Sequence, residues 1–402
     1  MLQCKTKWKK KKLGNICNSI TTGKLDANAM VEGGEYRFYT CAENYFKIDT
    51  FAFEGPSLLI SGNGANVGYV HYYDGKFNAY QRTYVLQNFS EDIFYIKHYL
   101  KAYLKDRIAK EVNAGNIPFI KLDTLTNMNI YYPADQDEQK RIADMLSTCD
   151  EVVEKTEETI EKYKKIKAGM MQDLFTKGLD ENGKLRPTYE QSPDLYKYSE
   201  ELDRYIPKEW DVDKLESDNV ATINPSCGKL PDEFIYIDLE SVINGNLEQT
   251  KIISRIGAPS RAQRLVENYD ILYQTVRPYQ KNNYLFVQTT NMRSVASTGY
   301  AQIRTVLNPL FLYQYLHTDL FVNKVLCYCT GTSYPAINPT NLGEIYIPIP
   351  KDNEQEIIAN LFKTIDIKIN KENEVLSKYK QIKQGLMKQL LTPPADAEIV
   401  EE

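Results

Sequence analysis

Hydrophobic residues recur at alternating spacings of four and three in two long stretches, 142–174 and 358–390. This spacing is the a/d repeat of a coiled-coil helix, and each stretch keeps it for more than four heptads. The predicted seam residues are Ile142, Leu146, Cys149, Val153, Thr156, Ile160, Tyr163, Lys167, Met170, Leu174, Ile358, Phe362, Ile365, Ile369, Glu372, Leu376, Tyr379, Lys383, Leu386 and Leu390. Each helix would be about 55 Å long. Both seams are expected to be buried away from water. The pattern therefore predicts that the two helices pack together.

The two stretches are copies of one another. A shift of 216 positions aligns Glu138-Gln139 with Glu354-Gln355, and "YKKIKAGMM" from Tyr163 with "YKQIKQGLM" from Tyr379. Roughly sixteen of the thirty-seven positions in 138–174 are identical, far above the ~6% expected by chance, which indicates duplication. Two equal halves related by a pseudo-two-fold axis require the helices to be antiparallel. The alternative is that each helix packs only on its own domain.

Short strand-like runs fill the sequence before each helix. They include "YRFYT", "SLLIS", "VGYVHYY", "TYVLQ", "FIYIDL", "DILYQTV", "NYLFVQTT" and "GYAQIRT", and each part then has a helix-like stretch at 91–112 or 308–328. We predict an α+β fold in which each domain has one curved, mostly antiparallel sheet. The expected order is a first domain at 1–134, a helix at 135–176, a connector at 177–205, a second domain at 206–351, a helix at 352–391 and an acidic tail at 392–402.

Composition narrows the class of protein. Seven cysteines in a long chain are typical of a reducing compartment, and the chain has no apolar run long enough for a signal peptide or a membrane span. We therefore expect a cytoplasmic protein. Thirty tyrosines against fourteen phenylalanines suit a binding surface. The lysine run from Lys5 to Lys12 is either a solvated terminus or part of such a surface, and the net charge of −5 does not itself indicate nucleic-acid binding.

The sequence motifs of common catalytic sites are missing. No G-x-x-x-x-G-K-[ST] phosphate loop is present, and the glycines of "GNGANVG" are followed by a strand-like run rather than by a helix. His71, His98 and His317 are solitary, and Cys327 and Cys329 form a single C-x-C without a second pair. We expect a binding protein with no catalytic residues, no metal site and no cofactor of its own.

The motifs in and around the two helices are similar to those of a known family. "IYYP", "EQKRIADML" and "YKKIKAGMMQDLF" in the first half, and "IYIP", "EQEIIANLF" and "YKQIKQGLMKQLL" in the second, resemble the specificity subunit of type I restriction–modification systems. The connector "LFTKGLDENGKLRPTYEQSP" followed by "YIPKEW" is similar to the central segment of that family, although the N-terminus is short.

The resemblance implies two target recognition domains, separated by two long helices packed as an antiparallel coiled coil. Each domain would read one half of a bipartite, asymmetric site on double-stranded DNA, and the helices would set the gap. The partners would be two methyltransferase subunits, which carry S-adenosylmethionine, and restriction/translocase subunits, which use ATP and Mg. We expect no membrane partner.

Base reading requires Arg, Lys, Asn and Gln side chains, and these are dense in the segments that differ between the halves. The candidate DNA-binding residues are Arg37, Asn63, Asn66, Tyr72, Tyr73, Asn78, Tyr80, Gln81 and Arg82 in the first domain, and Arg255, Arg261, Gln263, Arg264, Gln274, Arg277, Tyr279, Gln280, Lys281 and Asn282 in the second. The alternative function is a duplicated coiled-coil adaptor that holds two protein ligands and no DNA. A homodimer that pairs helices between chains is a third possibility.

Overall fold

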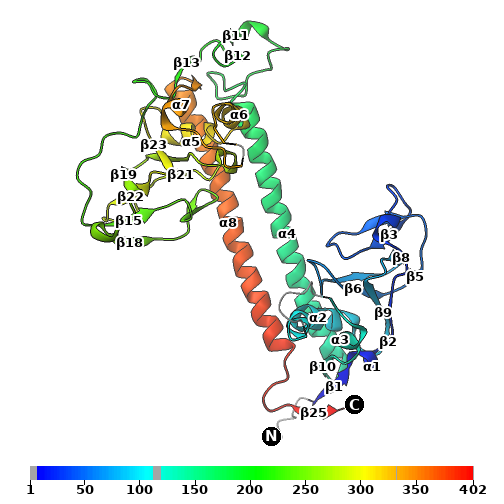
Figure 1. The fold of residues 1–402 in the computed structure, drawn as a ribbon. Helices are drawn as coiled ribbons and strands as arrows, with labels where there is room; N and C mark the ends of the chain where they lie inside the picture. Colours follow the sequence, from blue (N-terminus) through cyan, green and yellow to red (C-terminus); the bar gives the residue numbers. More distant parts are fainter. Residues whose placement is uncertain (1–6, 112–118, 332, 402) are drawn as a thin grey trace. The chain divides into compact units, whose positions relative to one another are not determined.

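The computed structural model describes residues 7–111, 119–331 and 333–401 (Figure 1). The chain divides into two compact units, which comprise Met1–Thr159 with Glu372–Glu402 and Ile160–Lys371. We call them the first and the second unit. Each contains one globular domain and one segment from each of the two long helices, α4 (Gln136–Leu174) and α8 (Asp352–Leu390). The 216-residue repeat in the sequence therefore has a counterpart in the structure.

The globular domain of the first unit contains two four-stranded sheets. Its elements are β1 (Lys7–Lys12), α1 (Leu13–Ile16), β2 (Cys17–Thr22), η1 (Ala27–Ala29), β3 (Tyr36–Tyr39), β4 (Phe46–Ile48), β5 (Phe53–Glu54), β6 (Ser57–Ser61), β7 (Val70–Tyr73), β8 (Lys76–Ala79), β9 (Thr83–Phe89), α2 (Ile93–Ala109), α3 (Leu122–Thr126) and β10 (Asn129–Pro133), with β25 (Glu398–Glu401) from the C-terminus. The sheet β2-β9-β6-β7 is antiparallel, whereas the sheet β4-β3-β8-β5 has a parallel pair, β3 and β8. Leu58, Leu86 and Leu100 are fully buried in a core that the first sheet shares with α2.

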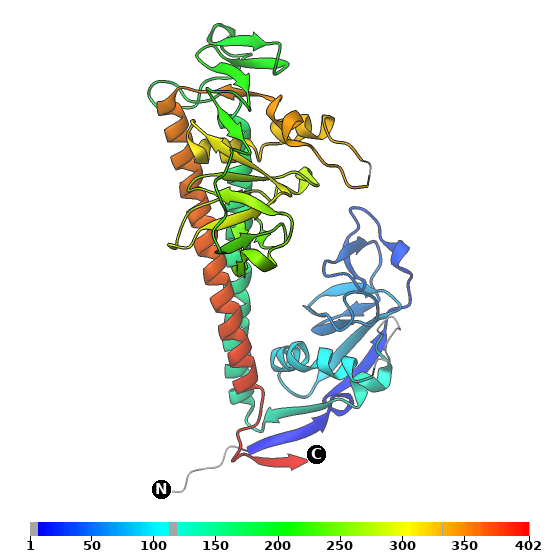
Figure 2. The same ribbon diagram turned by 60° about the vertical axis from the view of Figure 1, so that its left-hand side comes forward.

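The lysine run forms the middle strand of a small third sheet. Strand β1 pairs antiparallel with β10 and parallel with β25, so that the chain's last strand lies beside its first (Figure 2). Trp8 is buried, and Lys10 forms an ion pair of 2.6 Å with Glu401. Reading the run as a solvated terminus is therefore wrong for Lys7–Lys12, whereas Lys5 and Thr6 lie outside the described residues.

The second unit repeats this plan. Its elements are η2 (Pro193–Leu195), β11 (Tyr196–Ser199), β12 (Arg204–Pro207), β13 (Asp211–Lys214), β14 (Ala221–Ile223), β15 (Glu233–Ile237), β16 (Val242–Ile243), β17 (Asn246–Leu247), β18 (Lys251–Ser254), η3 (Arg255–Gly257), β19 (Ala262–Val266), β20 (Ile271–Gln274), η4 (Pro278–Gln280), β21 (Tyr284–Leu285), β22 (Ser294–Ser297), β23 (Tyr300–Thr305), α5 (Pro309–Tyr315), α6 (Asp319–Cys327), α7 (Pro339–Gly343) and β24 (Tyr346–Ile349). The sheet β14-β23-β20-β21 corresponds to β2-β9-β6-β7, and β18-β15-β22-β19 corresponds to β4-β3-β8-β5. The parallel pair also recurs, as β15 and β22. The α+β class is as predicted, but the expectation of one sheet per domain is wrong.

A buried glutamine joins each domain to its long helix in the same way. Gln139 accepts a hydrogen bond from the backbone N–H of Asp92, the N-cap of α2, and donates one to the carbonyl of Pro133. Gln355 accepts from the N–H of Asn308, the N-cap of α5, and donates to Pro350. Because both amides are buried, each must be satisfied internally. The "EQ" of the repeat therefore fixes the start of α2 in the first unit and of α5 in the second.

Segments of α4 and α8 pack antiparallel within each unit. In the second unit Lys167 of α4 donates to Asp366 of α8 at 2.7 Å. In the first unit Lys383 of α8 pairs with Asp150 of α4. These two ion pairs are copies of each other under the 216-residue shift, so the same register is specified twice. The lysines that interrupt each seam are thus neutralised by the opposite helix.

The predicted seam residues of α4 are all buried or half-buried, and those of α8 are too, with one exception. Tyr379 is 40% exposed and is not a seam residue. Its copy Tyr163 packs against the core of the second unit beneath Lys368, whereas Val152 stands at the position equivalent to Lys368. The contact between Lys368 and Tyr163 is therefore not repeated at Tyr379, because a valine replaces the lysine.

The connector is an ordered part of the second unit. Its strands β11 and β12 form a hairpin that extends beyond the start of α8 (Figure 1). Behind the hairpin, Glu354 of α8 accepts hydrogen bonds from Arg186, from the indole of Trp210 and from the backbone N–H of Leu179. All four residues are buried, so the connector is held to α8 by a charged cluster inside the protein.

Candidate nucleic-acid interface

In the first domain three loops meet at the ends of β3, β6 and β8. The thiol of Cys41 donates to the Asn63 side chain, and the Asn66 amide donates to the Cys41 carbonyl at 3.2 Å. The N–H of Gly62 donates to the carbonyl of Arg82. The structure therefore brings together three of the predicted residues, Asn63, Asn66 and Arg82, and the Arg82 side chain is exposed.

Arg37 lies in a cage of aromatic rings. Its guanidinium is 4.3 Å from the ring centroid of Tyr45 and 4.4 Å from that of Tyr73, and it donates to the hydroxyl of Tyr39. A half-buried arginine with three aromatic neighbours is held rigidly, because its planar cation stacks on ring faces. Tyr45, which sequence reasoning missed, is 43% exposed and leaves the cage open on one side.

Several predicted contacts have structural roles instead. Asn78 is 5% exposed, and its amide donates to the carbonyl of Thr50. The prediction that Asn78 contacts DNA is therefore wrong, because its side chain lies in the domain interior. Tyr72 packs on Phe94 with ring centroids 4.6 Å apart, beside the core. Gln274 is likewise buried and donates to the carbonyl of Val276. Asn78 and Gln274 are therefore interior residues, whereas Tyr72 is half-buried beside the core.

The remaining residues of the first set lie in the turn before β9. Tyr80 is half-buried and pairs with Leu25 through a backbone bridge, and the exposed Gln81 donates to Asp26 at 2.6 Å. Together with Arg82, they place exposed polar side chains beside the Asn63 loop.

In the second domain, the loop 275–283 between β20 and β21 corresponds to the loop between β6 and β7 that carries Asn63 and Asn66. The Arg277 guanidinium lies 4.3 Å from the ring centroid of Tyr334, and Lys281 forms a 2.6 Å ion pair with Asp319. The Asn282 amide donates to the carbonyl of Val242. The loop also carries the exposed side chains of Tyr279 and Gln280. Tyr334 was missed because it is 57 residues from Arg277 in the sequence, and only the fold brings the two together.

The other predicted residues of the second domain form a separate group along β18, η3 and β19. Arg255 pairs with Asp232, and Gln263 donates to the carbonyl of Ser260. Arg261 is exposed, whereas Arg264 is half-buried and burial lowers its pKa. An exposed guanidinium such as that of Arg261 can bind an anion or a base edge. The predicted residues of the second domain therefore form two groups, one on the loop 275–283 and one along β18, η3 and β19.

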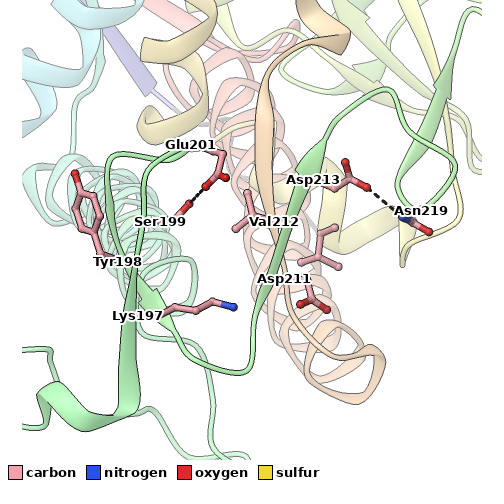
Figure 3. Close-up of a pocket in the computed structure, with 9 residues that line it drawn as sticks. Lys197, Tyr198, Ser199, Glu201, Asp211, Val212, Asp213 and Asn219 are labelled. Atoms are coloured by element: carbon pink, nitrogen blue, oxygen red, sulfur yellow. Dashed lines mark hydrogen bonds between the residues drawn. The ribbon is translucent and has the colours of Figure 1, made fainter.

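The second unit also contains an open polar hollow of about 660 Å³. Figure 3 shows the residues that line it, which are Lys197, Tyr198, Ser199, Glu201, Asp211, Val212, Asp213, Asn219 and Ile349. A hydrogen bond from Asn219 lowers the pKa of Asp213, and hydrogen bonds from its own backbone and from Ser199 lower that of Glu201. Both carboxylates are thus ionised near neutral pH, and neither is poised as a general acid.

Among residues 7–111, 119–331 and 333–401, no cluster of three or more His, Cys, Asp or Glu side chains is arranged to hold a metal ion. Within the same residues, no helix has the length and apolar content to cross a membrane.

Both domains have the same two sheets and the same buried glutamine, but their exposed loops carry different residues. These features are typical of a duplicated recognition protein with two different binding surfaces. The chain matches the family model described as "Type I restriction modification DNA specificity domain" twice, at residues 5–165 and 207–381. It belongs to this family. The resemblance noted from the sequence is thus confirmed, and the adaptor alternative is not favoured.

Individual relatives agree with this assignment. The chain is 27% identical over 406 residues to the type I restriction enzyme EcoDI specificity subunit of Escherichia coli, covering 94% of this chain and 87% of that protein. It is 26% identical over 368 residues to the type I restriction enzyme MjaVIII specificity subunit of Methanocaldococcus jannaschii, covering 83% and 78%. The crystal structure of a type I restriction–modification S subunit from M. genitalium matches with a TM-score of 0.63 at 20% identity, covering 98% and 99% of the two chains, which shows the shared fold.

Proposed function

We propose that this chain is the DNA-reading subunit of a type I restriction–modification complex. Each globular domain would read one half of a bipartite, asymmetric site in double-stranded DNA, and the paired helices would set the unspecified gap. The observation that carries the proposal is the double family match, one for each domain. The different loop residues of the two domains, such as Asn63 and Arg277, support two different half-sites.

Catalysis would belong to the partner subunits. Methyltransferase subunits would bind S-adenosylmethionine and flip the target base out of the duplex, and restriction/translocase subunits would use ATP and Mg. Partners would also offset the net charge of −5, since binding to DNA phosphates requires positive charge. The role of this chain would be to select the site and to hold the partners on it.

The first test is selection from a pool of randomised DNA duplexes by the full chain with its methyltransferase partner. We expect enrichment of two short blocks separated by a constant gap. Exchanging residues 1–134 for those of a relative should change one block and leave the other. Binding that falls uniformly with rising salt and enriches no motif would contradict the proposal, because phosphate contacts alone behave in this way.

Two copies of the methyltransferase subunit fit a duplicated surface of the helices. Met145 and Ile382 are 45% and 53% exposed in the first unit, and their copies Leu361 and Ile166 are 40% and 42% exposed in the second. Apolar side chains that are exposed at the same positions of both repeats favour the same partner on each unit. We infer that each of the two pairs contributes to one docking site.

A charge placed on one pair should remove one partner. We expect Ile382→Glu to reduce the ratio of methyltransferase to specificity subunit from two to one, because burying an unpaired carboxylate in an interface is unfavourable. Ile166→Glu should do the same, and the double variant should bind neither copy. Native mass spectrometry measures the ratio, and the exposed Gln384→Glu provides a charge-matched control. If both single variants still bind two copies, these residues are not part of the docking sites.

A further inference from the structure

The loop after β6 and the loop after β20 make equivalent backbone contacts. Gly62 accepts a hydrogen bond from the N–H of Ile120, and Thr275 accepts the equivalent bond from Ile337. The next residue in each loop, Asn63 or Val276, then makes a backbone bridge to Phe119 or Ala336. Corresponding positions of the two loops therefore differ by 213 in residue number.

This alignment pairs glycines with cationic residues at two unusual backbone positions. In the first domain Gly64 and Gly68 have φ of +81° and +80°. At the equivalent places the second domain has Arg277 and Lys281, each with φ of +53°. Glycine adopts this left-handed conformation freely, whereas a residue with a long side chain is strained in it. The first domain therefore shows that the loop forms without side chains at these positions.

A strained residue that could be replaced by glycine without changing the loop indicates a function for its side chain. The surroundings of Arg277 indicate which function. Its guanidinium stacks on Tyr334, which is 65% exposed, and no described atom accepts the proton of its buried Nε. Lys281, by contrast, is neutralised by Asp319. Arg277 thus has an oriented planar cation with unused donors beside an exposed ring.

We propose that Arg277 is a specificity-determining residue of the second domain and that it reads a guanine in that domain's half-site. The guanidinium fork matches the O6 and N7 acceptors of guanine in the major groove, and the Tyr334 ring fixes the plane of the fork. Lys281 does not read a base. The first domain, which has glycines at both places, reads its half-site with other side chains. This inference rests on the proposed function.

The test compares Arg277→Gly, Arg277→Lys and Lys281→Gly in the full chain, with the methyltransferase partner and a randomised duplex pool. Arg277→Gly should keep the melting temperature within about 3 °C of the parent, because it removes strain. It should also lose a guanine from one block only, with discrimination at that position falling about 10- to 100-fold. Arg277→Lys should lose the same preference, since lysine keeps the charge but not the fork. The strain-matched control Lys281→Gly should leave both blocks intact.

Three outcomes would overturn the inference. An unchanged motif with uniformly weaker binding would make Arg277 a phosphate contact. A large fall in the melting temperature would make it a structural residue. Equal loss of the block in Lys281→Gly would assign the preference to the loop conformation. In each case a bipartite motif with the parent chain would leave the proposed function standing, whereas no motif with the parent would contradict that function.

Discussion

Replacing Glu354 by alanine is expected to destabilise the second unit by about 3–5 kcal/mol. The carboxylate accepts hydrogen bonds from Arg186, from Trp210 and from the N–H of Leu179, at 2.8, 3.0 and 2.6 Å. Without it, the buried indole of Trp210 and the N–H of Leu179 would lose this acceptor. The buried Arg186 guanidinium would keep only the Lys177 carbonyl and the exposed Glu209 carboxylate, 3.3 and 3.4 Å away. Gly178 lies so close that an added Cβ would fall 2.3 Å from Glu354, so the site has no room to rearrange. Urea unfolding gives the loss, and limited proteolysis should show earlier cleavage in the connector.

Two further variants separate uncompensated charge from lost packing. Glu138 occupies the same point of the first repeat but is only half-buried, so we expect Glu138→Ala to cost less than about 1 kcal/mol. The double change Arg186→Met with Glu354→Leu removes both charges and should recover most of the stability. If the double variant is no more stable than Glu354→Ala, the carboxylate is needed for its hydrogen bonds to Trp210 and Leu179 rather than for neutralising Arg186.

The helices were the most predictable part of the fold. A seam of ten positions per helix is a strong signal, because it comes from local spacing alone. The antiparallel direction followed from the repeat and agrees with the Lys167–Asp366 and Lys383–Asp150 pairs. The exposure of Tyr379 could not be predicted, because its copy Tyr163 has the same place in the repeat and is half-buried.

The sheets and the connector depended on contacts that are distant in sequence. Strand-like runs such as "SLLIS" were recognised, but their division into two sheets requires the pairing partners, which sequence periodicity does not give. The strand of lysines at 7–12 has no apolar alternation apart from Trp8, and it exists because β10 and β25 pair with it. Likewise Arg186, a polar residue of the predicted connector, is buried and donates a hydrogen bond to Glu354 of α8.

The candidate site was predictable as a region more than as a set of residues. Composition located the variable segments, because base-reading side chains are chemically distinctive. It could not separate Asn78 and Gln274, which hydrogen-bond inside their domains, from exposed neighbours such as Gln81. The equivalence of Gly64 and Arg277 was also hidden, since it is a likeness of backbone conformation between unlike side chains.

Acid should destabilise the first unit through His98. This histidine is fully buried on α2, with Nε2 3.0 Å from the Ser147 hydroxyl, and burial lowers its pKa to about 4. The ordinary value is about 6.5, so between these two pH values the unfolded chain binds a proton that the folded chain does not. Stability therefore falls as pH falls through this window, by about 2 kcal/mol between pH 7 and pH 5 from this residue alone.

The repeat supplies a replacement that does not titrate, because Gln314 occupies the equivalent buried position in the second unit and donates to Asp366. His98→Gln should therefore reduce the loss of unfolding free energy between pH 7 and pH 5 by about 2 kcal/mol. Urea midpoints at pH 7, 6 and 5 measure the change, and acid titration of carboxylates is common to both proteins and cancels in the comparison. A variant whose stability curve is merely displaced, parallel to that of the parent, would show that His98 acts through packing alone. A curve that flattens between pH 5 and 6.5 would identify the buried imidazole as the acid-sensitive group of the first unit.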